Sequence, residues 1–252
     1  MPYLTVDKIR IYYVKKGKGK PLVFLHGAFM DISAYEEAID LLSKKYCVYA
    51  MDFPFHGKSD GLKNYATLSS FAQILSKCIN QLRLKNPSIC AHSAGCIVAI
   101  CYASKNKVQE LILIEPSGLR YFRRKLDFFL RIIYTKFFAV CMSNASAKRK
   151  INLYKSGFFN FFKNITRKQF LYLLEREFEK DYISEMQKIN CKVTVLWAKS
   201  DELLPFKYSN QFMKNLRHAH LLEIEGPHDW IILNPDKIKC ILETYAAPKQ
   251  KF

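Results

Sequence analysis

Short, mostly apolar runs recur along the chain and alternate with segments of helical periodicity. The apolar runs lie at 21–25, 47–51, 89–91, 111–114, 192–197 and 220–224, and helical periodicity covers 33–44, 68–82, 96–104 and 206–214. Runs without a polar side are typical of strands buried on both faces. Their alternation with helices predicts an α/β fold with a mostly parallel, doubly wound sheet. Residues 3–14 are expected to add an opening hairpin.

Polar side chains that could do chemistry follow most of these runs directly. They are His26, Asp52, Ser93, Asp201 and His228. The carboxyl ends of parallel strands meet at one edge of a sheet, and doubly wound folds bind their ligands there. We therefore expect the five residues to gather at that edge.

Ser93 lies in Ala91-His92-Ser93-Ala94-Gly95, between a predicted strand and a predicted helix. A serine on a sharp strand-to-helix turn presents its hydroxyl outward, and small residues are needed on both sides because the backbones approach closely. The helix N-terminus behind Ser93 adds partial positive charge where an oxyanion would form. The pattern indicates a nucleophile, although an ordinary turn would have the same pattern.

A serine hydroxyl needs a base within hydrogen-bond reach, and the base needs a third group to fix its tautomer. Serine, then acid, then histidine is a known order for such a triad. The sequence therefore predicts Ser93 as nucleophile, Asp201 as acid and His228 as general base. Glu202 and Glu115 are alternative acids, since each also follows a predicted strand.

An oxyanion needs backbone N–H donors near the nucleophile. Ala94, directly after Ser93, is expected to supply one donor. The turn after the first parallel strand is expected to supply the other, from Ala28 in preference to Phe29.

Residues 118–190 break the alternation, because they predict several helices and no buried strand. They hold 16 of the 40 Lys and Arg residues, 6 of the 22 Asp and Glu residues, and 16 of the 34 Phe and Tyr residues. A helical insertion above the strand ends predicts a lid whose aromatic side chains either line an apolar pocket or pack on the body. We expect a core of residues 1–117 and 191–252 with a lid of residues 118–190.

The formal net charge of +18 is compatible with an anionic partner or with a solvated, lysine-rich surface. Arg120, Arg123 and Arg124 cluster at the start of the insertion and are predicted contacts for an anionic substrate or partner. Charge without a recognition motif does not predict nucleic-acid binding. A membrane surface is an alternative partner for this charge.

Cysteine spacing and hydropathy argue against a disulfide-bonded, metal-binding, membrane-spanning or secreted protein. The eight cysteines form no CxxC pair and lie mostly in apolar runs, which predicts free thiols, no disulfide and no metal site. The chain has no apolar run of the ~20 residues that a spanning helix needs, and no signal-peptide pattern. We expect a soluble, cytoplasmic protein that uses no cofactor.

These motifs together resemble the α/β-hydrolase superfamily in its lid-bearing form, over nearly the whole chain outside 118–190. His26-Gly27 resembles the oxyanion-loop signature, and residues 91–95 resemble the Gly-x-Ser-x-Gly elbow with Ala91 for the first glycine. Residues 52–59 resemble the Asp-x-Pro-Gly-x-Gly-x-Ser turn, with Phe55 in place of the first glycine. The resemblance implies the α/β-hydrolase fold and a serine mechanism without a metal.

The resemblance implies a serine hydrolase, with carboxylesterase activity on an acyl ester as the default. His26, Phe29 and Trp230 are expected to contact the substrate. Esterases of pimeloyl groups on an acyl carrier protein dock that acidic carrier through basic lid residues, and the basic segment 118–190 makes this an alternative. Thioesterases, C–C bond hydrolases and non-catalytic ligand-binding modules on the same fold also stay open.

Overall fold

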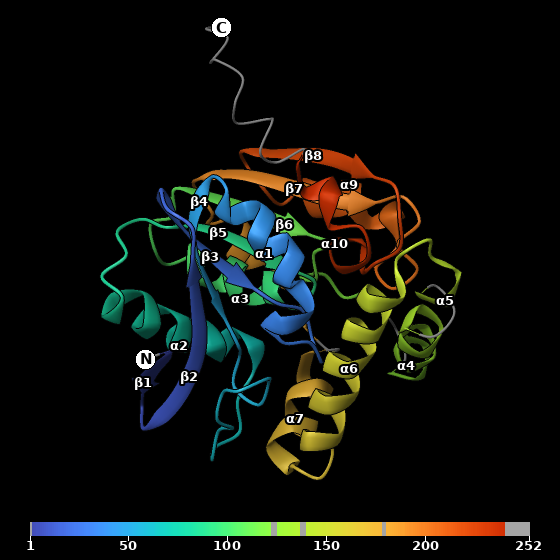
Figure 1. Ribbon diagram of the computed structural model, residues 1–252. Coiled ribbons are helices and arrows are strands. Elements are labelled where there is room, and N and C mark those ends of the chain that lie inside the picture. The colour runs from blue at the N-terminus through green and yellow to red at the C-terminus, as the bar shows by residue number, and fades with distance from the viewer. Residues whose placement is uncertain (1, 122–124, 137–139, 178–179, 240–252) are drawn as a thin grey trace, which may run out of the picture.

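The computed structural model describes residues 2–121, 125–136, 140–177 and 180–239. Within these residues an eight-stranded sheet has the order β1-β2-β4-β3-β5-β6-β7-β8 (Figure 1). Strands β3 to β8 are parallel, while β2 pairs antiparallel with β1 and β4. The predicted α/β fold with a mostly parallel sheet is confirmed. The strands are β1 (Tyr3–Val6), β2 (Ile9–Lys16), β3 (Lys20–Leu25), β4 (Tyr46–Met51), β5 (Ser88–His92), β6 (Glu110–Ile114), β7 (Lys192–Ala198) and β8 (Ala219–Ile224).

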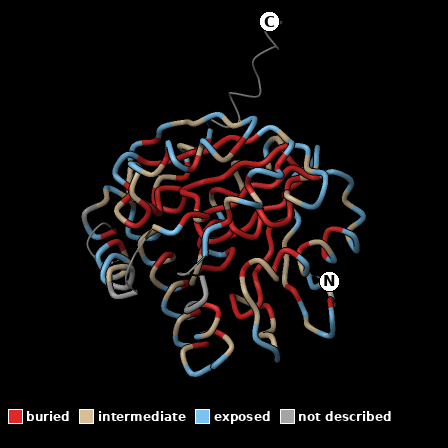
Figure 2. Tube along the Cα trace, turned by 180° about the vertical axis from the view of Figure 1, so that it is seen from behind, coloured by how far each residue is buried: buried red, intermediate tan, exposed pale blue. Residues whose placement is uncertain are grey.

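Helices cover both faces of this sheet, because side chains of each central strand alternate between two cores. Leu22 and Phe24 of β3 enter the core shared with α1 (Glu36–Ser43) and α10 (Trp230–Leu233). Val23 and Leu25 enter the opposite core, shared with α2 (Leu68–Gln81), α3 (Gly95–Ala103) and α9 (Ser209–Met213). Figure 2 shows the buried trace through the centre of the molecule and the exposed segments around it. Burial on both faces explains why these runs carry no polar side.

The described part of residues 118–190 is helical and contains no strand. Its helices are α4 (Lys125–Tyr134), α5 (Val140–Met142), α6 (Ala147–Asn164), α7 (Lys168–Glu177) and α8 (Ile183–Met186). Figure 1 shows α4 to α7 on one side of the molecule, next to the α1 and α10 region. The long helix α6 makes the main connection to the body, since it contacts the turn before α1 and also α10.

The side of α6 that faces the body is largely polar. Ser156, Asn160 and Asn164 are buried at helical spacing together with Leu153. Asn160 donates to Asp31 Oδ2 at 2.8 Å and accepts from Gly57 N at 2.7 Å. These bonds link the loop after β3 to the loop after β4 through one side chain of α6.

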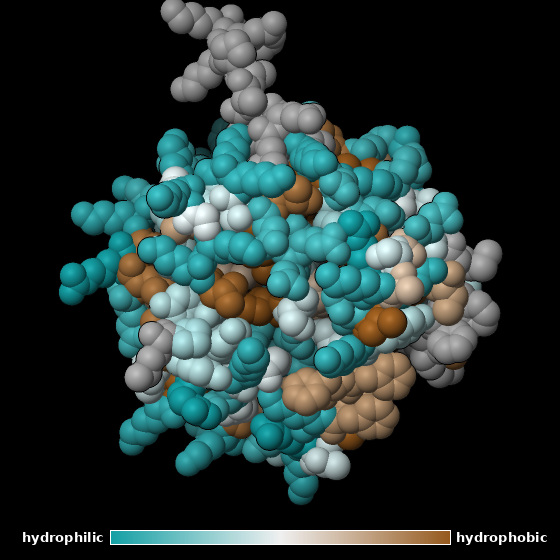
Figure 3. Space-filling model, in the orientation of Figure 1, coloured by the Kyte–Doolittle hydropathy of each residue, from teal (hydrophilic) through white to brown (hydrophobic). Residues whose placement is uncertain are grey.

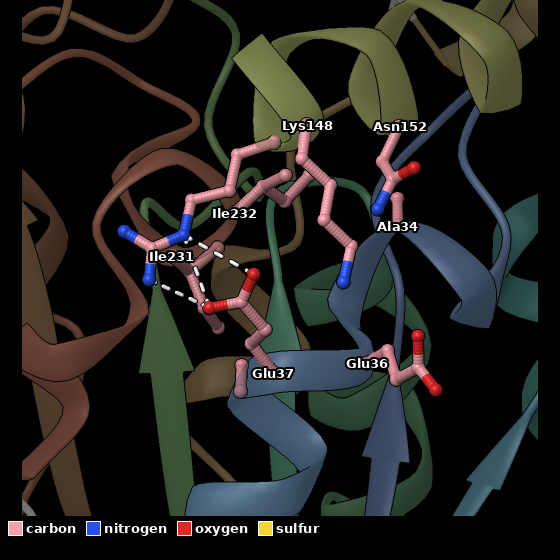
Figure 4. A pocket seen from close by; sticks show the side chains of 9 residues that line it. Ala34, Glu36, Glu37, Lys148, Asn152, Ile231 and Ile232 are labelled. Atoms are coloured by element: carbon pink, nitrogen blue, oxygen red, sulfur yellow. Dashed lines mark hydrogen bonds and ion pairs between the residues drawn. The ribbon is translucent and has the colours of Figure 1, made fainter. Parts of the chain in front are cut away.

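Further contacts fix both ends of α6. Near its start, the Arg149 guanidinium binds the Glu37 carboxylate with N–O distances of 2.6 and 3.0 Å. Figure 4 shows Glu37 on α1 facing the part of α6 that carries Lys148 and Asn152. At the other end, Asn164 Nδ2 donates to the Phe55 carbonyl at 2.6 Å. The helix therefore sits in a fixed position on the body.

The seven cysteines within the described residues are free, in line with the expectation from their spacing. Five are buried, Cys191 is partly exposed, and Cys141 is exposed with its sulfur 3.5 Å from the Tyr154 hydroxyl of α6. Among the helices of the described chain, none combines the length and apolar character required to cross a bilayer.

Candidate active site

Ser93 occupies a strained turn between β5 and α3. Its φ is +51°, in the left-handed region that costs a non-glycine residue roughly 1–3 kcal/mol. Its N–H donates to the Ile114 carbonyl at 2.9 Å, and its carbonyl accepts from Cys96 N at 2.9 Å. A Cβ on Gly95 would lie 2.6 Å from the His26 carbonyl oxygen. A small residue is therefore needed at position 95 because a side chain there would clash with the end of β3.

Ser93, His228 and Asp201 form one hydrogen-bonded chain. Ser93 Oγ lies 2.9 Å from His228 Nε2, and His228 Nδ1 lies 2.8 Å from Asp201 Oδ2. The other Asp201 oxygen accepts from Leu203 N at 2.8 Å and Leu204 N at 2.7 Å. Burial raises the pKa of Asp201, but His228 and these donors outweigh it, so that the pKa stays below its ordinary value. The carboxylate is thus held ionised beside the imidazole.

Glu115, the alternative acid after β6, is buried in the same cluster but is not bonded to the histidine. Its Oε1 accepts from Ala198 N at 2.7 Å and from Trp230 Nε1 at 2.5 Å. Burial, followed by the nearby Asp201 charge, raises its pKa well above the ordinary value. The other alternative, Glu202, also has a pKa raised by burial. Asp201 is the carboxylate that contacts His228.

The loop after β3 faces Ser93 and brings a backbone N–H group to the same pocket as Ala94. Ala28 and Ala94 both line the pocket at Ser93. Within the described part of the chain, no group accepts a hydrogen bond from the N–H of either residue. Gly27 fixes the approach of this loop, because a Cβ there would lie 3.0 Å from His92 Nδ1 and 3.2 Å from Ser93 Cβ. Two unpaired donors beside a serine hydroxyl suit a developing oxyanion.

The pocket at Ser93 has a cavity volume of about 60 Å³. Its apolar wall consists of Phe29 and Met30 from the loop after β3, Ile132 from α4, and Leu203 and Leu204 after β7. Residues from three separate parts of the chain therefore bound the space that a substrate would occupy.

A partly buried ion pair lies at the same pocket and was not among the sequence-based predictions. Lys136 Nζ lies 2.5 Å from Asp229 Oδ2, and both residues line the pocket. Burial raises the pKa of Asp229, but the Lys136 charge outweighs it and keeps that pKa below its ordinary value. The position of Asp229 directly after His228 was a signal in the sequence. Lys136 gave none, because it lies within an apolar stretch of the insertion.

His92 connects residues on both sides of the turn at Ser93 through hydrogen bonds. Tyr35 Oη accepts from Gly27 N at 3.0 Å and donates to His92 Nδ1 at 2.8 Å, while His92 Nε2 faces the His228 carbonyl at 3.2 Å. Burial and the His228 charge lower the pKa of His92 to about 3. A neutral His92 thus links the loop after β3, the turn at Ser93 and His228.

Three predicted substrate contacts lie away from the pocket wall. His26 is fully buried, where its Nδ1 donates to the Gly27 carbonyl at 2.8 Å and its Nε2 accepts from Phe53 N at 2.9 Å. Trp230 is fully buried on Glu115. Arg120 is exposed and does not line the pocket. Phe29 does line it, whereas Arg123 and Arg124 lie outside the described residues.

Asp52 is the fifth polar residue expected at the sheet edge, and its carboxylate connects the loop after β3 to the loop after β4. Its carboxylate accepts from Ile32 N and Lys58 N, each at 2.9 Å. Burial raises its pKa to about 7. Phe55, which stands where the resembling motif has glycine, takes φ +72° and is buried against Phe170. Phe55 thus packs against the helical insertion and does not line the pocket at Ser93.

Two buried groups bring three possible metal-ligand atoms within 4.8 Å of one another: His92, His228 and Asp229, and Glu115, Asp201 and His228. Both groups share His228, whose ring nitrogens already contact Ser93 and Asp201. A metal ion could bind only if His228 gave up one of these contacts. The arrangement suits proton transfer better than metal binding.

Comparisons with known proteins identify relatives that share the fold. The sequence profile described as alpha/beta hydrolase fold matches residues 20–164. Over 87 residues the chain is 36% identical to (E)-2-((N-methylformamido)methylene)succinate hydrolase of Acinetobacter baylyi, covering 34% of this chain and 33% of that protein. Over 109 residues it is 30% identical to pimeloyl-[acyl-carrier protein] methyl ester esterase of Nitrosomonas europaea, covering 42% and 41%. The chain thus spans about a third to two fifths of these relatives' length.

Among solved structures, the esterase EaEST from Exiguobacterium antarcticum is similar over nearly the whole chain. The TM-score is 0.78 at 20% identity, and the match covers 96% of this chain and 98% of that chain. At this identity the likeness concerns the fold.

Proposed function

Since this chain belongs to the α/β-hydrolase fold family, we propose that it is a serine hydrolase that cleaves a carboxylic ester through an acyl-enzyme on Ser93. The observation that carries the proposal is the continuous chain of short contacts from Ser93 Oγ through His228 to Asp201. A hydroxyl, an imidazole and an ionised carboxylate in this order can generate an alkoxide-like nucleophile near neutral pH.

The reaction proceeds in two halves. Ser93 Oγ attacks the ester carbonyl carbon while its proton passes to His228 Nε2, and the carbonyl oxygen becomes an oxyanion. The N–H groups of Ala28 and Ala94 stabilise that oxyanion, which is typically worth 10²–10³ in kcat for each donor. Collapse breaks the C–O bond, and His228 returns the proton to the leaving alcohol. Water then releases the acid by the same steps, with His228 again as base.

Asp201 keeps His228 in the required tautomer. Its Oδ2 accepts a hydrogen bond from Nδ1–H, so that Nε2 is left free to accept the serine proton. When the ring becomes an imidazolium, the ionised carboxylate stabilises it. Two backbone donors from Leu203 and Leu204 hold the carboxylate in place.

The identity of the nucleophile is tested by labelling with a fluorophosphonate. We expect one equivalent of label on Ser93, and we expect Ser93→Ala to lower kcat on p-nitrophenyl butyrate by at least about a thousandfold. Ser104→Ala, at the other end of α3, is the matched control and should keep full labelling and turnover. A folded chain with an unlabelled Ser93, or a Ser93→Ala variant with full turnover, would contradict the proposal.

Labelling without sustained turnover of any ester would instead indicate the non-catalytic ligand-binding module. Release of many equivalents of p-nitrophenol per chain, over a series of esters of increasing acyl length, separates the two functions. The small pocket at Ser93, of about 60 Å³, favours short acyl groups.

A carrier-bound acyl ester is the second candidate substrate, favoured by the identity to the Nitrosomonas europaea esterase and by the positive charge of residues 118–190. Electrostatic docking of an acidic carrier makes kcat/KM fall steeply with ionic strength. We expect that fall for a carrier-bound methyl ester and not for the free ester. Equal salt dependence for the two substrates would rule out docking through charge.

A further inference from the structure

Helix α6 turns its apolar side chains toward solvent. The side that contacts the body is formed mainly by Ser156, Asn160 and Asn164. On the other side Ile151, Phe158, Phe159 and Phe162 are 60%, 60%, 56% and 64% exposed. Figure 3 shows apolar side chains gathered on the surface over α6. We call Ile151, Phe158, Phe159 and Phe162 the α6 outer face.

The α6 outer face is an ordered surface. The rings of Phe158 and Phe162 stack with centroids 5.8 Å apart and planes 16° apart, and Phe161 packs edge-on against Phe162 at 5.5 Å. Burying one such side chain gains about 1.5–3 kcal/mol. A contiguous group of exposed aromatic rings on a helix fixed to the body marks an interaction surface.

The charges around this face are positive. Residues 147–164 contain the basic residues Lys148, Arg149, Lys150, Lys155 and Lys163 and no Asp or Glu. Lys148 and Lys155 are exposed, whereas Lys163 donates to the Gly57 carbonyl at 2.8 Å.

Exposed lysines outnumber exposed carboxylates in the groove beside Phe159. Its charged residues are the lysines Lys15, Lys16, Lys58 and Lys155, the surface carboxylates Glu36 and Asp40, and the buried carboxylates Asp31 and Asp52. Asp40 is already paired with Lys16. An aromatic face edged by lysines therefore fits a partner that offers both apolar contact and negative charge.

We propose that the α6 outer face docks this protein on the surface of anionic lipid bilayers. Phenylalanine side chains on the apolar face of an interfacial helix are buried at the boundary between headgroups and acyl chains. A helix with one apolar and one polar face lies in the plane of that boundary. Lysines near the surface add about 1 kcal/mol each on an anionic leaflet. In α6 the polar face bonds to the protein, so the apolar face is free for lipid.

This mode of binding is peripheral. An 18-residue helix is about 27 Å long, and α6 is tied to the body along its polar side by Arg149, Asn160 and Asn164. It therefore contacts the bilayer while remaining part of the folded protein. Docking requires none of the groups around Ser93, so the proposal stands apart from the proposed hydrolase activity.

Flotation with vesicles tests the aromatic contribution. The probes are phosphatidylcholine vesicles with and without about 30 mol % phosphatidylglycerol, at about 0.1 M salt. We expect the full chain to float with the anionic vesicles and Phe158→Ser/Phe162→Ser to bind them at least about tenfold more weakly. Tyr65→Ser/Leu130→Ser is the matched control, because these side chains are 59% and 55% exposed elsewhere. It should bind within about twofold of the wild type.

The lysines are tested in the same assay. Lys148→Gln/Lys155→Gln should lose most of the preference for anionic over neutral vesicles, and Lys105→Gln/Lys107→Gln, after α3, should retain it. Thermal unfolding confirms that each variant is folded. The proposal is overturned if the wild-type chain stays unbound, or if the phenylalanine variant binds as well as its control. Binding of an acidic acyl carrier protein that needs Phe158 and Phe162, without vesicle binding, would assign the face to a protein instead.

Discussion

Asp201 and Glu115 are buried side by side near His228, yet their surroundings favour opposite charge states. Asp201 has backbone donors and the histidine, which keep its pKa below the ordinary value despite burial. Glu115 accepts from Ala198 N and the Trp230 indole, but burial and the Asp201 charge raise its pKa well above the ordinary value. A neutral Glu115 next to an ionised Asp201 avoids two adjacent negative charges.

Glu115→Gln should therefore change the pH dependence of stability. The protonated form of Glu115 stabilises the fold fully below its unfolded pKa of about 4.5, and this contribution is lost as the pH rises toward the higher folded pKa. Glutamine cannot ionise. We expect the Tm of the variant relative to the wild type to increase as the pH is raised above about 4.5, by about 2–4 °C for each kcal/mol.

The measurement is thermal unfolding of both chains between about pH 4.5 and pH 9. Glu115→Ala is the informative contrast, because it leaves the Ala198 N–H and the Trp230 indole N–H unpaired and should be less stable than Glu115→Gln by about 1–3 kcal/mol at every pH. A constant difference in Tm between Glu115→Gln and the wild type across this range would show that Glu115 does not titrate differently in the folded chain.

Sequence reasoning identified the residues at the strand ends but could not assign every side chain a direction. Asp201 and Glu115 both follow strands, and only the hydrogen bond to His228 Nδ1 separates them. His26 and Trp230 likewise follow strands, yet their polar atoms satisfy buried backbone and carboxyl groups. Residue type and position do not reveal which partner a loop side chain meets.

At the scale of elements, α6 departs from the usual pattern in which the apolar side of a helix is buried. Its sequence has an apolar and a polar side, but the polar side is buried because Asp31, Gly57 and Phe55 offer it hydrogen-bond partners. Aromatic residues in the insertion were expected to line the pocket or to pack on the body. Phe161 and Phe170 do contact Phe29, whereas the α6 outer face does neither.

Asn160→Ala should loosen the loop after β3 and the loop after β4 together. The change leaves Gly57 N without its partner, removes one of the two hydrogen bonds to Asp31 Oδ2, and should lower the free energy of unfolding by about 1–3 kcal/mol. The loop that holds Asp31 also carries Ala28, so we expect kcat to fall by about tenfold. Urea unfolding and ester hydrolysis measure the two effects.

Asn152→Ala is the control for that change, since Asn152 lies on the same helix and is only partly buried. It should leave unfolding free energy within about 0.5 kcal/mol of the wild type. If Asn160→Ala lowered stability without changing kcat, the bonds of α6 would hold the fold and have no influence on the oxyanion loop.

At the scale of the whole molecule, the strands were the most predictable part. Runs such as 22–25 and 111–114 have every residue buried, and a fully apolar run leaves few alternatives to a central strand. The order of strands was not predictable in the same way. That β3 lies between β4 and β5 depends on contacts between distant segments, which periodicity does not encode.

The net charge of +18 should make the fold more stable as salt is added. Like charges spread over one molecule repel each other, and raising the ionic strength from about 0.01 M to about 0.15 M shortens the screening length from about 30 Å to about 8 Å. We expect the Tm to rise over this range, equally in sodium and potassium chloride. A falling Tm would mean that attractive surface pairs, such as that of Lys77 with Asp7, outweigh the repulsion.

The exposed thiol of Cys141 has a practical consequence. It lies 3.5 Å from the Tyr154 hydroxyl of α6, while Cys47, Cys78, Cys90, Cys96 and Cys101 are sealed in the interior. In a chain that carries Cys191→Ser and Cys240→Ser, a maleimide dye would thus attach mainly beside this helix. The emission of the dye would change when a vesicle or a substrate binds nearby. Cys141 is therefore a natural labelling position at the surface where binding is expected.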